Sequence, residues 1–289
     1  DSSTTGRLVT FAREINSAEV LSCIAAAARC ADEEIAIGIA GEISRRDNFK
    51  DDPHLPLMVW WILEQHAISS PEGVLKLFSE PDFWQHGIVS GYLVERLMRR
   101  FAAEGTQQGF LYSARLLEMA PDMKAKQRLM KGFAEAVKGV QLGALPKALE
   151  VELKKTPDLL SIALMLRMRI DGAAQLAVTS LGNSKLQEAE RIELISTLGE
   201  VLPPQAKPAL VKVLNGQSTD KVKAAAIGAL RGYSADEGVV SHLIECVKSG
   251  SPSLREAAIE YLSGNRNAAL GFLRIVAVSY THLTLPTNR

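Results

Sequence analysis

Paired cysteines, net charge and long apolar runs are all missing from this chain. Its three cysteines, Cys23, Cys30 and Cys246, form no metal-ligand pattern, and the first two lie about two helical turns apart, too far for a disulfide. We therefore expect buried free thiols. Basic and acidic residues number 33 each, so no net positive field favours a nucleic acid. No apolar run approaches the roughly 20 residues that a membrane-spanning helix needs, so we expect none.

Sequence signatures of catalysis are scarce too. The chain has no glycine-flanked serine elbow and no cysteine with a matching histidine. His86 and His242 have no visible acid or base partner in the sequence. We therefore predict no catalytic residue, no cofactor-binding residue and no metal ligand, and interpret the chain as a segment without enzyme activity.

Apolar residues at helical spacing are what the chain has instead. With 47% hydrophobic residues over 289 positions it can bury a large core, as one elongated array or as two globular domains. Leu8–Arg46 predicts about three helices, one around Leu8–Ile15 and two opened by Ser17 and Asp32 as N-caps. No strand alternation occurs before Val278. The sequence therefore predicts an all-α fold.

The stretch Asp51–Ala67 predicts an unusually apolar helix. Asp52 can cap it and Pro53 suits its first turn, so we expect the helix to start there. One face at helical spacing holds Leu55, Val59, Ile62 and His66, and Leu57, Trp60, Trp61 and Glu64 widen the stripe.

Proline, glycine and capping residues place the next helices. Ser70 with Pro71 opens a short helix, and Glu80-Pro81-Asp82 opens one that runs towards Glu104. Gly105-Thr106 predicts a tight helix hairpin, whose second arm ends at Pro121. Further helices are expected over Asp122–Lys138 with Gly139 as the stop, Leu145–Lys155, and Pro157–Ile170.

A repeat of 32 residues is the firmest internal pattern. Glu190–Leu198, Val222–Leu230 and Leu254–Leu262 align with basic and apolar positions in register. The aligned positions are Arg191, Lys223 and Arg255; Leu194, Ala226 and Ala258; Ile195, Ile227 and Ile259; and Leu198, Leu230 and Leu262. Breaks are expected at Pro203-Pro204, Gly216, Ser234, Gly250 and Ser251-Pro252. Such spacing is typical of short HEAT-type units, which bury a core only by stacking. The sequence thus predicts a HEAT-type α-solenoid of antiparallel helix pairs.

Three clusters are candidate sites with a structural alternative. Asp51, Asp52, His54, Glu64 and His66 carry metal-ligand chemistry, but their spacing matches no metal motif and Asp52 has a capping role. Arg96, Arg99, Arg100 and Glu104 can bind an anion, although a solvated ion-pair ladder explains their spacing better. Trp60, Trp61 and Trp84 can form a docking patch, although core packing is the favoured interpretation.

Asp51–Ala67 and Tyr92–Pro121 resemble the helical-repeat region of large bacterial membrane-bound dehydrogenases. In that family a β-propeller precedes HEAT-type repeats, and a c-type cytochrome domain with a CxxCH motif follows. The resemblance covers only the middle module, so it assigns no catalytic or haem-binding residue here. It implies a scaffold in an exported redox protein of the periplasm or cell envelope, with haem c in a C-terminal domain outside this sequence. Its partners would be neighbouring propeller and cytochrome domains or an electron-transfer protein.

The chain divides into three expected parts. Residues 1–140 form a helical array with the double-tryptophan helix, and residues 141–277 form the HEAT-type repeats. Residues 278–289 resemble a translated sequencing-adaptor read-through and are excluded from functional reasoning. Because the chain starts at Asp1 without a methionine, we expect a piece of a longer protein. Two alternatives stay open: a free-standing HEAT-repeat adaptor that binds another protein, and a repeat enzyme resembling chromophore lyases.

Overall fold

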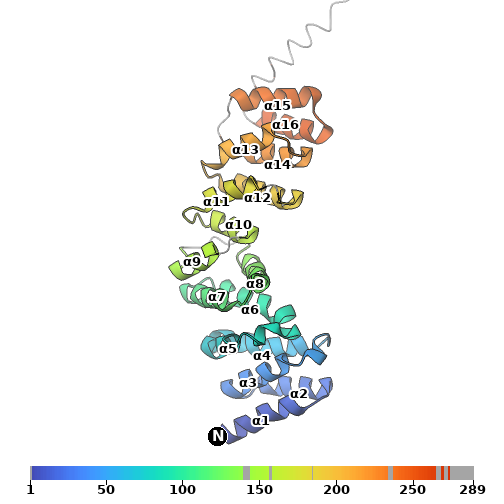
Figure 1. Ribbon diagram of the computed structural model, residues 1–289, viewed down its shortest axis with the longest axis vertical. Coiled ribbons are helices and arrows are strands. Elements are labelled where there is room, and N and C mark those ends of the chain that lie inside the picture. Colours follow the sequence, from blue (N-terminus) through green and yellow to red (C-terminus); the bar gives the residue numbers. More distant parts are fainter. Residues whose placement is uncertain are drawn as a thin grey trace, which may run out of the picture. The chain divides into compact units, whose positions relative to one another are not determined.

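The computed structural model describes residues 2–138, 144–155, 158–183, 185–233, 237–264, 268–269 and 273. Throughout these residues the secondary structure is helical, without a strand, which confirms the predicted all-α class (Figure 1). None of the described helices is long and apolar enough to cross a membrane. Two compact units, Asp1–Ser161 and Ile162–Arg289, divide the chain within α10 (Leu159–Arg167). The boundary predicted between residues 140 and 141, and the tail from 278, lie outside the described residues.

The first unit stacks helices in two layers, because each helix contacts the next but one along the chain (Figure 1). One layer contains α1 (Ser2–Glu14), α3 (Glu33–Ser44), α5 (Pro71–Phe78), α7 (Gln107–Met119) and α9 (Lys147–Lys155). The other contains α2 (Ala18–Ala28), α4 (Leu55–Ser69), α6 (Val94–Ala103) and α8 (Met123–Ala136). The 3₁₀ turns Asp47–Phe49 and Phe83–Gln85 and the π-helical turn Val89–Leu93 lie between them in sequence.

The second unit repeats the two-layer scheme. Its first layer is α11 (Ala173–Leu181), α13 (Ala206–Asn215) and α15 (Glu237–Ser249), and its second is α12 (Glu188–Val201), α14 (Asp220–Leu230) and α16 (Pro252–Gly264). The predicted 32-residue repeat falls on the second layer, one copy in each helix. The predicted breaks at Pro203-Pro204, Gly216, Gly250 and Ser251-Pro252 all lie between or at the ends of helices; Ser234 is outside the described residues.

Burial confirms the repeat register in most copies. The positions of Leu194 and Leu198 are buried in all three helices. Ile195 and Ile227 are fully buried, whereas the equivalent Ile259 is 42% exposed. The difference follows from stacking: α12 and α14 are each followed by another helix of their layer, and α16 is the last such helix among the described residues.

Caps that act within their own helix form as the sequence predicts for Ser17 and Thr106. The side chains of Ser17, Thr106 and Asp122 accept hydrogen bonds from the backbone N–H groups of Val20, Gly109 and Ala125. Asp32 and Ser70 occupy the predicted N-cap positions without a side-chain capping bond. Gly105 takes the predicted left-handed conformation after α6, with φ of 63°.

Two predicted helix starts were wrong. The double-tryptophan helix begins at Leu55 with Pro56 in its first turn, rather than at Pro53, although Asp52 still accepts hydrogen bonds from the N–H groups of His54 and Leu55. No continuous helix opens at Asp82: a 3₁₀ turn comes first, and the helix that leads into α6 starts at Gly87. That later start has a tertiary cause, because the carboxylate that binds the Gly87 N–H comes from Asp47.

Candidate docking surface

Asp52 and His66 of the double-tryptophan region have separate structural roles. Leu55, Val59, Ile62 and His66 make the predicted buried face of α4, so His66 lies in the core. Two backbone N–H groups hydrogen-bond the Asp52 carboxylate and lower its pKa. Within the described ranges, no group of three or more histidine, cysteine, aspartate or glutamate side chains can hold a metal ion. Asp52 therefore binds the backbone at the start of α4, as expected of a capping side chain, although His54 and not Asp52 is the N-cap residue.

The tryptophans belong mainly to the hydrophobic core. Trp60 and Trp84 are buried, which confirms the core interpretation for both, while Trp61 is half-buried beneath the guanidinium of Arg29, 5.5 Å from the ring centroid.

The four charged residues Arg96, Arg99, Arg100 and Glu104, along and just after α6, form a ladder only in part. Arg100 pairs with Glu104 one turn on. Arg99 instead reaches Glu135 of α8 at 3.6 Å, and the Arg96 guanidinium lies 3.6 Å from the centroid of the Tyr92 ring. One pair thus forms within the cluster, and the other two arginines turn to Glu135 and Tyr92 outside it.

The prediction of buried thiols was wrong for two of the three cysteines. Cys23 and Cys30 are exposed, and Cys246 is partly buried, with its pKa raised by that burial. Helix α2 packs through Leu21, Ala25 and Ala28, and position 23 lies on another side of the helix from this stripe. All three are free thiols, as predicted.

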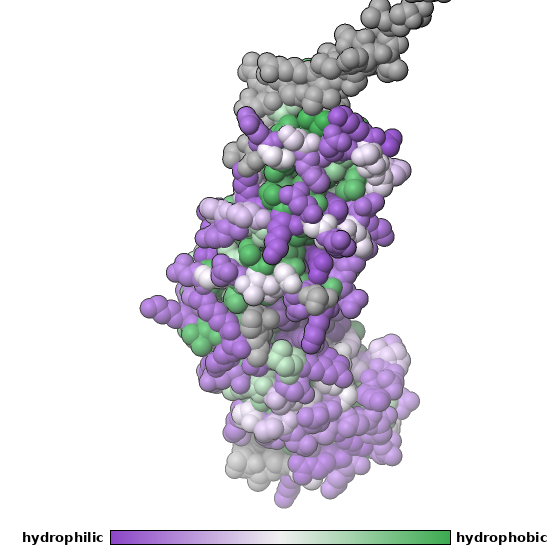
Figure 2. Space-filling view, turned by 45° about the horizontal axis from the view of Figure 1, so that its top comes forward, coloured by the Kyte–Doolittle hydropathy of each residue, from purple (hydrophilic) through white to green (hydrophobic). Residues whose placement is uncertain are grey.

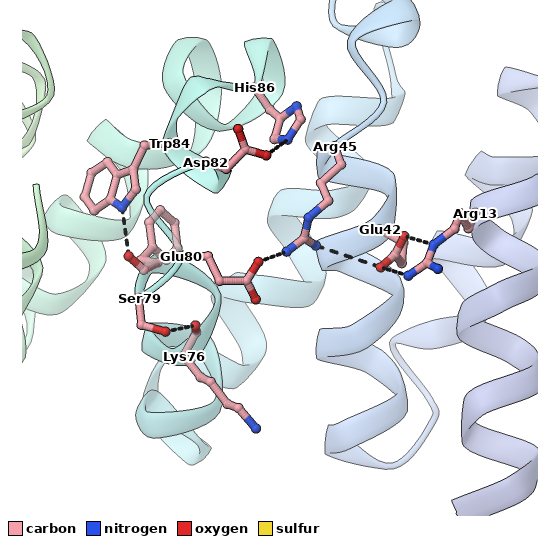
Figure 3. A network of polar contacts seen from close by, with 10 residues as sticks. Arg13, Glu42, Arg45, Lys76, Ser79, Glu80, Asp82, Trp84 and His86 are labelled. Atoms are coloured by element: carbon pink, nitrogen blue, oxygen red, sulfur yellow. Dashed lines mark hydrogen bonds and ion pairs between the residues drawn. The ribbon is translucent and has the colours of Figure 1, made fainter. Parts of the chain in front are cut away.

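Charged side chains join helices of successive pairs in the first unit (Figure 3). The Arg13 guanidinium of α1 donates two 2.8 Å hydrogen bonds to Glu42 of α3, which lowers the pKa of Glu42. Arg45, at the end of α3, binds Glu80 after α5 at 2.7 Å and lies over the Phe83 ring. This chain of contacts links three helices of one layer.

His86 has the acid partners that the sequence did not reveal. Its Nδ1 lies 3.2 Å from Asp47 Oδ2, and its Nε2 lies 3.7 Å from Asp82 Oδ2. The other Asp47 oxygen accepts a 2.6 Å hydrogen bond from the Gly87 N–H, which is the largest cause of the lowered pKa of Asp47. Asp47 thus caps a helix that starts 40 residues later in the chain. His242 lies in α15 and is partly buried.

The repeated basic position of the second unit also has a structural role. Arg191 and Arg255 donate hydrogen bonds to the carbonyl oxygens of Asn183 and Gly250, which follow the preceding helix in each case. Ion pairs between helices of the second unit include Arg167 with Glu200 at 3.1 Å and Arg231 with Glu260 at 2.5 Å. These charges therefore bind the array together.

Exposed apolar side chains remain after these contacts are assigned. Figure 2 shows hydrophobic residues in separate patches among hydrophilic side chains on the face in view. In the first unit, a groove of about 510 Å³ lies between α7 and α9. It contains Leu111, 36% exposed, and Val151, 53% exposed. Its other lining residues are Gln108, Tyr112, Ala114, Arg115, Glu118, Lys147, Ala148, Glu152 and Lys155.

The two walls of this α7–α9 groove follow helical periodicity. Residues 108, 111, 112, 115 and 118 share one face of α7, and residues 147, 148, 151, 152 and 155 share one face of α9. Leu149 and Leu153 turn the opposite way, into the core. The groove therefore runs along both helices, which is the shape that accepts an elongated protein segment. The groove was not predicted from the sequence. The one sign of it there is Val151, an apolar residue of α9 that lies off the helix face formed by Leu149 and Leu153.

A smaller cavity of about 320 Å³ lies in the second unit, beside the starts of α11 and α13. Arg169 and Leu202, the non-glycine residues with positive φ in the described chain, both line it, at 54° and 55°. Both follow helix C-termini, where the left-handed conformation closes the last turn.

Comparison with known proteins identifies one part of the chain. Residues 176–263 match HEAT repeats, which covers α12 to α15 and most of α11 and α16. No curated protein and no solved structure matches the chain. The predicted HEAT-type character of the 32-residue repeats is therefore confirmed, and stacked HEAT repeats are typical of helical scaffolds and interaction modules.

Proposed function

We propose that this chain is a scaffold that docks proteins along its helical array. The observation that carries the proposal is the α7–α9 groove, where Leu111 and Val151 stay exposed although neighbouring apolar residues of both helices are buried. Exposed apolar residues gathered in a groove favour a protein interaction. The described ion pairs and the Asp47 cap support the same conclusion, because they serve to join helices.

We further propose that the array holds neighbouring domains of a larger exported redox protein. This part rests on the resemblance of Asp51–Ala67 and Tyr92–Pro121 to the repeat region of bacterial membrane-bound dehydrogenases. In such a protein the propeller would carry the dehydrogenase chemistry and the cytochrome domain the haem c. The array would set the distance between them, in the periplasm or at the cell envelope.

A free-standing adaptor is the second candidate, and the same groove favours it. Recovering the complete reading frame separates the two, since a propeller upstream and a CxxCH motif downstream would establish the multidomain protein. A start codon and a stop codon that closely flank this segment would establish the adaptor.

Hydrogen–deuterium exchange then tests docking itself. If neighbouring domains dock on the array, amides of α7 and α9 should exchange more slowly in the whole protein than in this chain alone, with α2 as the internal control. Equal exchange along the entire array would contradict a docking role for this segment within that protein.

A further inference from the structure

The α7–α9 groove contains a carboxylate that is only partly satisfied. The Glu152 side chain is 7% exposed, and its Oε1 accepts a hydrogen bond from the Lys155 ammonium. Its Oε2 is buried and receives no hydrogen bond from any of the residues that the structure describes. A buried carboxylate with one unpaired oxygen is unfavourable, because the charge has lost water without gaining full compensation. The groove therefore lacks a donor at this position.

The other polar groups of the groove do not supply that donor. Arg115 is already bound to Glu72 of α5 through both of its terminal nitrogens. Lys155 has a side chain that is 49% exposed, so its long stem can move aside when a stronger donor enters. The half-buried Tyr112 also lines the groove and offers an aromatic face, which attracts cations.

We propose that the α7–α9 groove binds a partner-protein segment that presents an arginine next to apolar side chains. The guanidinium would displace Lys155 and, once the Glu152 carboxylate turns towards the groove, bind its two oxygens in a fork, and the apolar neighbours would cover Leu111 and Val151. This inference rests on the proposed docking function and specifies the chemistry of the partner.

Two isosteric probes test the charge requirement on the full chain. n-Pentylguanidinium carries the arginine head and an apolar stem, and n-pentylurea has the same shape without the charge. Methyl NMR of Leu111 and Val151 reports binding of each probe. We expect saturable shifts at both methyl groups with the guanidinium and an affinity at least about fivefold lower for the urea.

Variants identify the groups responsible. Glu152→Gln keeps the shape of the side chain, and we expect it to reduce guanidinium affinity to that of the urea while urea binding stays unchanged. Val151→Ser, at an exposed position, should weaken both probes. Ile68→Ser is the matched control, because Ile68 is an exposed apolar residue of α4, 41% exposed, that does not line the groove, and it should change neither affinity.

Three other results would overturn the proposal or its arginine requirement. Equal affinity for both probes in the unchanged chain would overturn the arginine requirement and leave the docking function standing. Absence of shifts at Leu111 and Val151, or shifts unaffected by Glu152→Gln, would overturn the proposal. If the same methyl groups shift when the chain is concentrated without a probe, and sedimentation shows a dimer, the occupant is a second copy and the proposal is wrong.

Discussion

Gly132 of α8 lies directly against the main chain of Glu95 in α6. A Cβ atom at position 132 would approach the Glu95 carbonyl oxygen to 2.1 Å, closer than any real contact of that kind. The two helices can pack this closely because position 132 has no side chain. Lys131 reaches Glu95 at 3.1 Å beside this contact, so packing and charge act at the same place.

Gly132→Ala should lower the free energy of unfolding by about 1–3 kcal/mol, because the helices must separate to admit the methyl group. The matched control is Gly228→Ala in α14, where an added Cβ meets nothing within 4 Å. Alanine is the better helix former, so that change should raise stability by about 0.5–1 kcal/mol. Urea denaturation measures both. A Gly132→Ala chain as stable as the original would contradict the close α6–α8 contact.

Ala226→Leu tests the stacking of the HEAT repeats. Ala226 is fully buried in α14, at the position that repeats as Leu194 and Ala258. A leucine there should overpack the contact with neighbouring helices and cost about 1–3 kcal/mol in thermal or chemical unfolding. Ala189→Leu, at an exposed position of α12, is the control and should cost little. Original stability in Ala226→Leu would mean that another face of α14 meets its neighbours.

Asp47 should make the first unit sensitive to acid. Its pKa in the folded chain lies below the ordinary value of 3.8, because the Gly87 N–H and His86 favour the carboxylate. Its contribution is therefore complete above about pH 4 and is lost as the pH falls through the lowered pKa. Asp47→Asn should flatten the acid side of the stability curve, measured by urea unfolding between about pH 5 and pH 2. Asp51→Asn, at an exposed position nearby, controls for the change of charge; an unchanged slope in Asp47→Asn would exclude this role.

His66→Leu should raise stability rather than lower it. Both ring nitrogens of His66 are buried and have no hydrogen-bond partner within the described part of the chain, and such a group costs about 1–3 kcal/mol. Leucine fills a similar space, so we expect a gain of about 1 kcal/mol in the free energy of unfolding. Ser113→Ala is the contrasting control, because Ser113 is buried and donates a 2.9 Å hydrogen bond to the Gly109 carbonyl. A large loss of stability in His66→Leu would indicate that the imidazole has a partner in solution.

Interactions that act within one helix or at a fixed repeat distance could be predicted from the sequence. The caps Ser17 and Thr106 could be predicted because each binds a backbone group three residues further along the chain. The 32-residue repeat appeared because stacked helices demand the same apolar positions in each copy. Both kinds of signal are local or periodic.

Interactions between distant residues could not be predicted in this way. The cap that Asp47 provides for Gly87 joins residues 40 positions apart, so the helix start at Asp82 was wrong. The exposure of Cys23 depends on which face of α2 meets its neighbours, and the sequence of one apolar helix does not fix that choice. The α7–α9 groove likewise depends on contacts between distant residues, such as the hydrogen bond from Gln107 of α7 to the Ala144 carbonyl, 37 residues later and just before α9.

We propose that this chain docks other proteins and carries no redox centre of its own. Covalent c-type haem attachment needs two cysteines close together before a histidine, and Cys23, Cys30 and Cys246 do not provide that arrangement. The most direct measurement is the absorbance spectrum of the purified chain, produced in cells that attach haem c, followed by dye reduction with sugar substrates. We expect no Soret band and no turnover. Stoichiometric haem, or turnover that a point mutation within the chain abolishes, would contradict the claim.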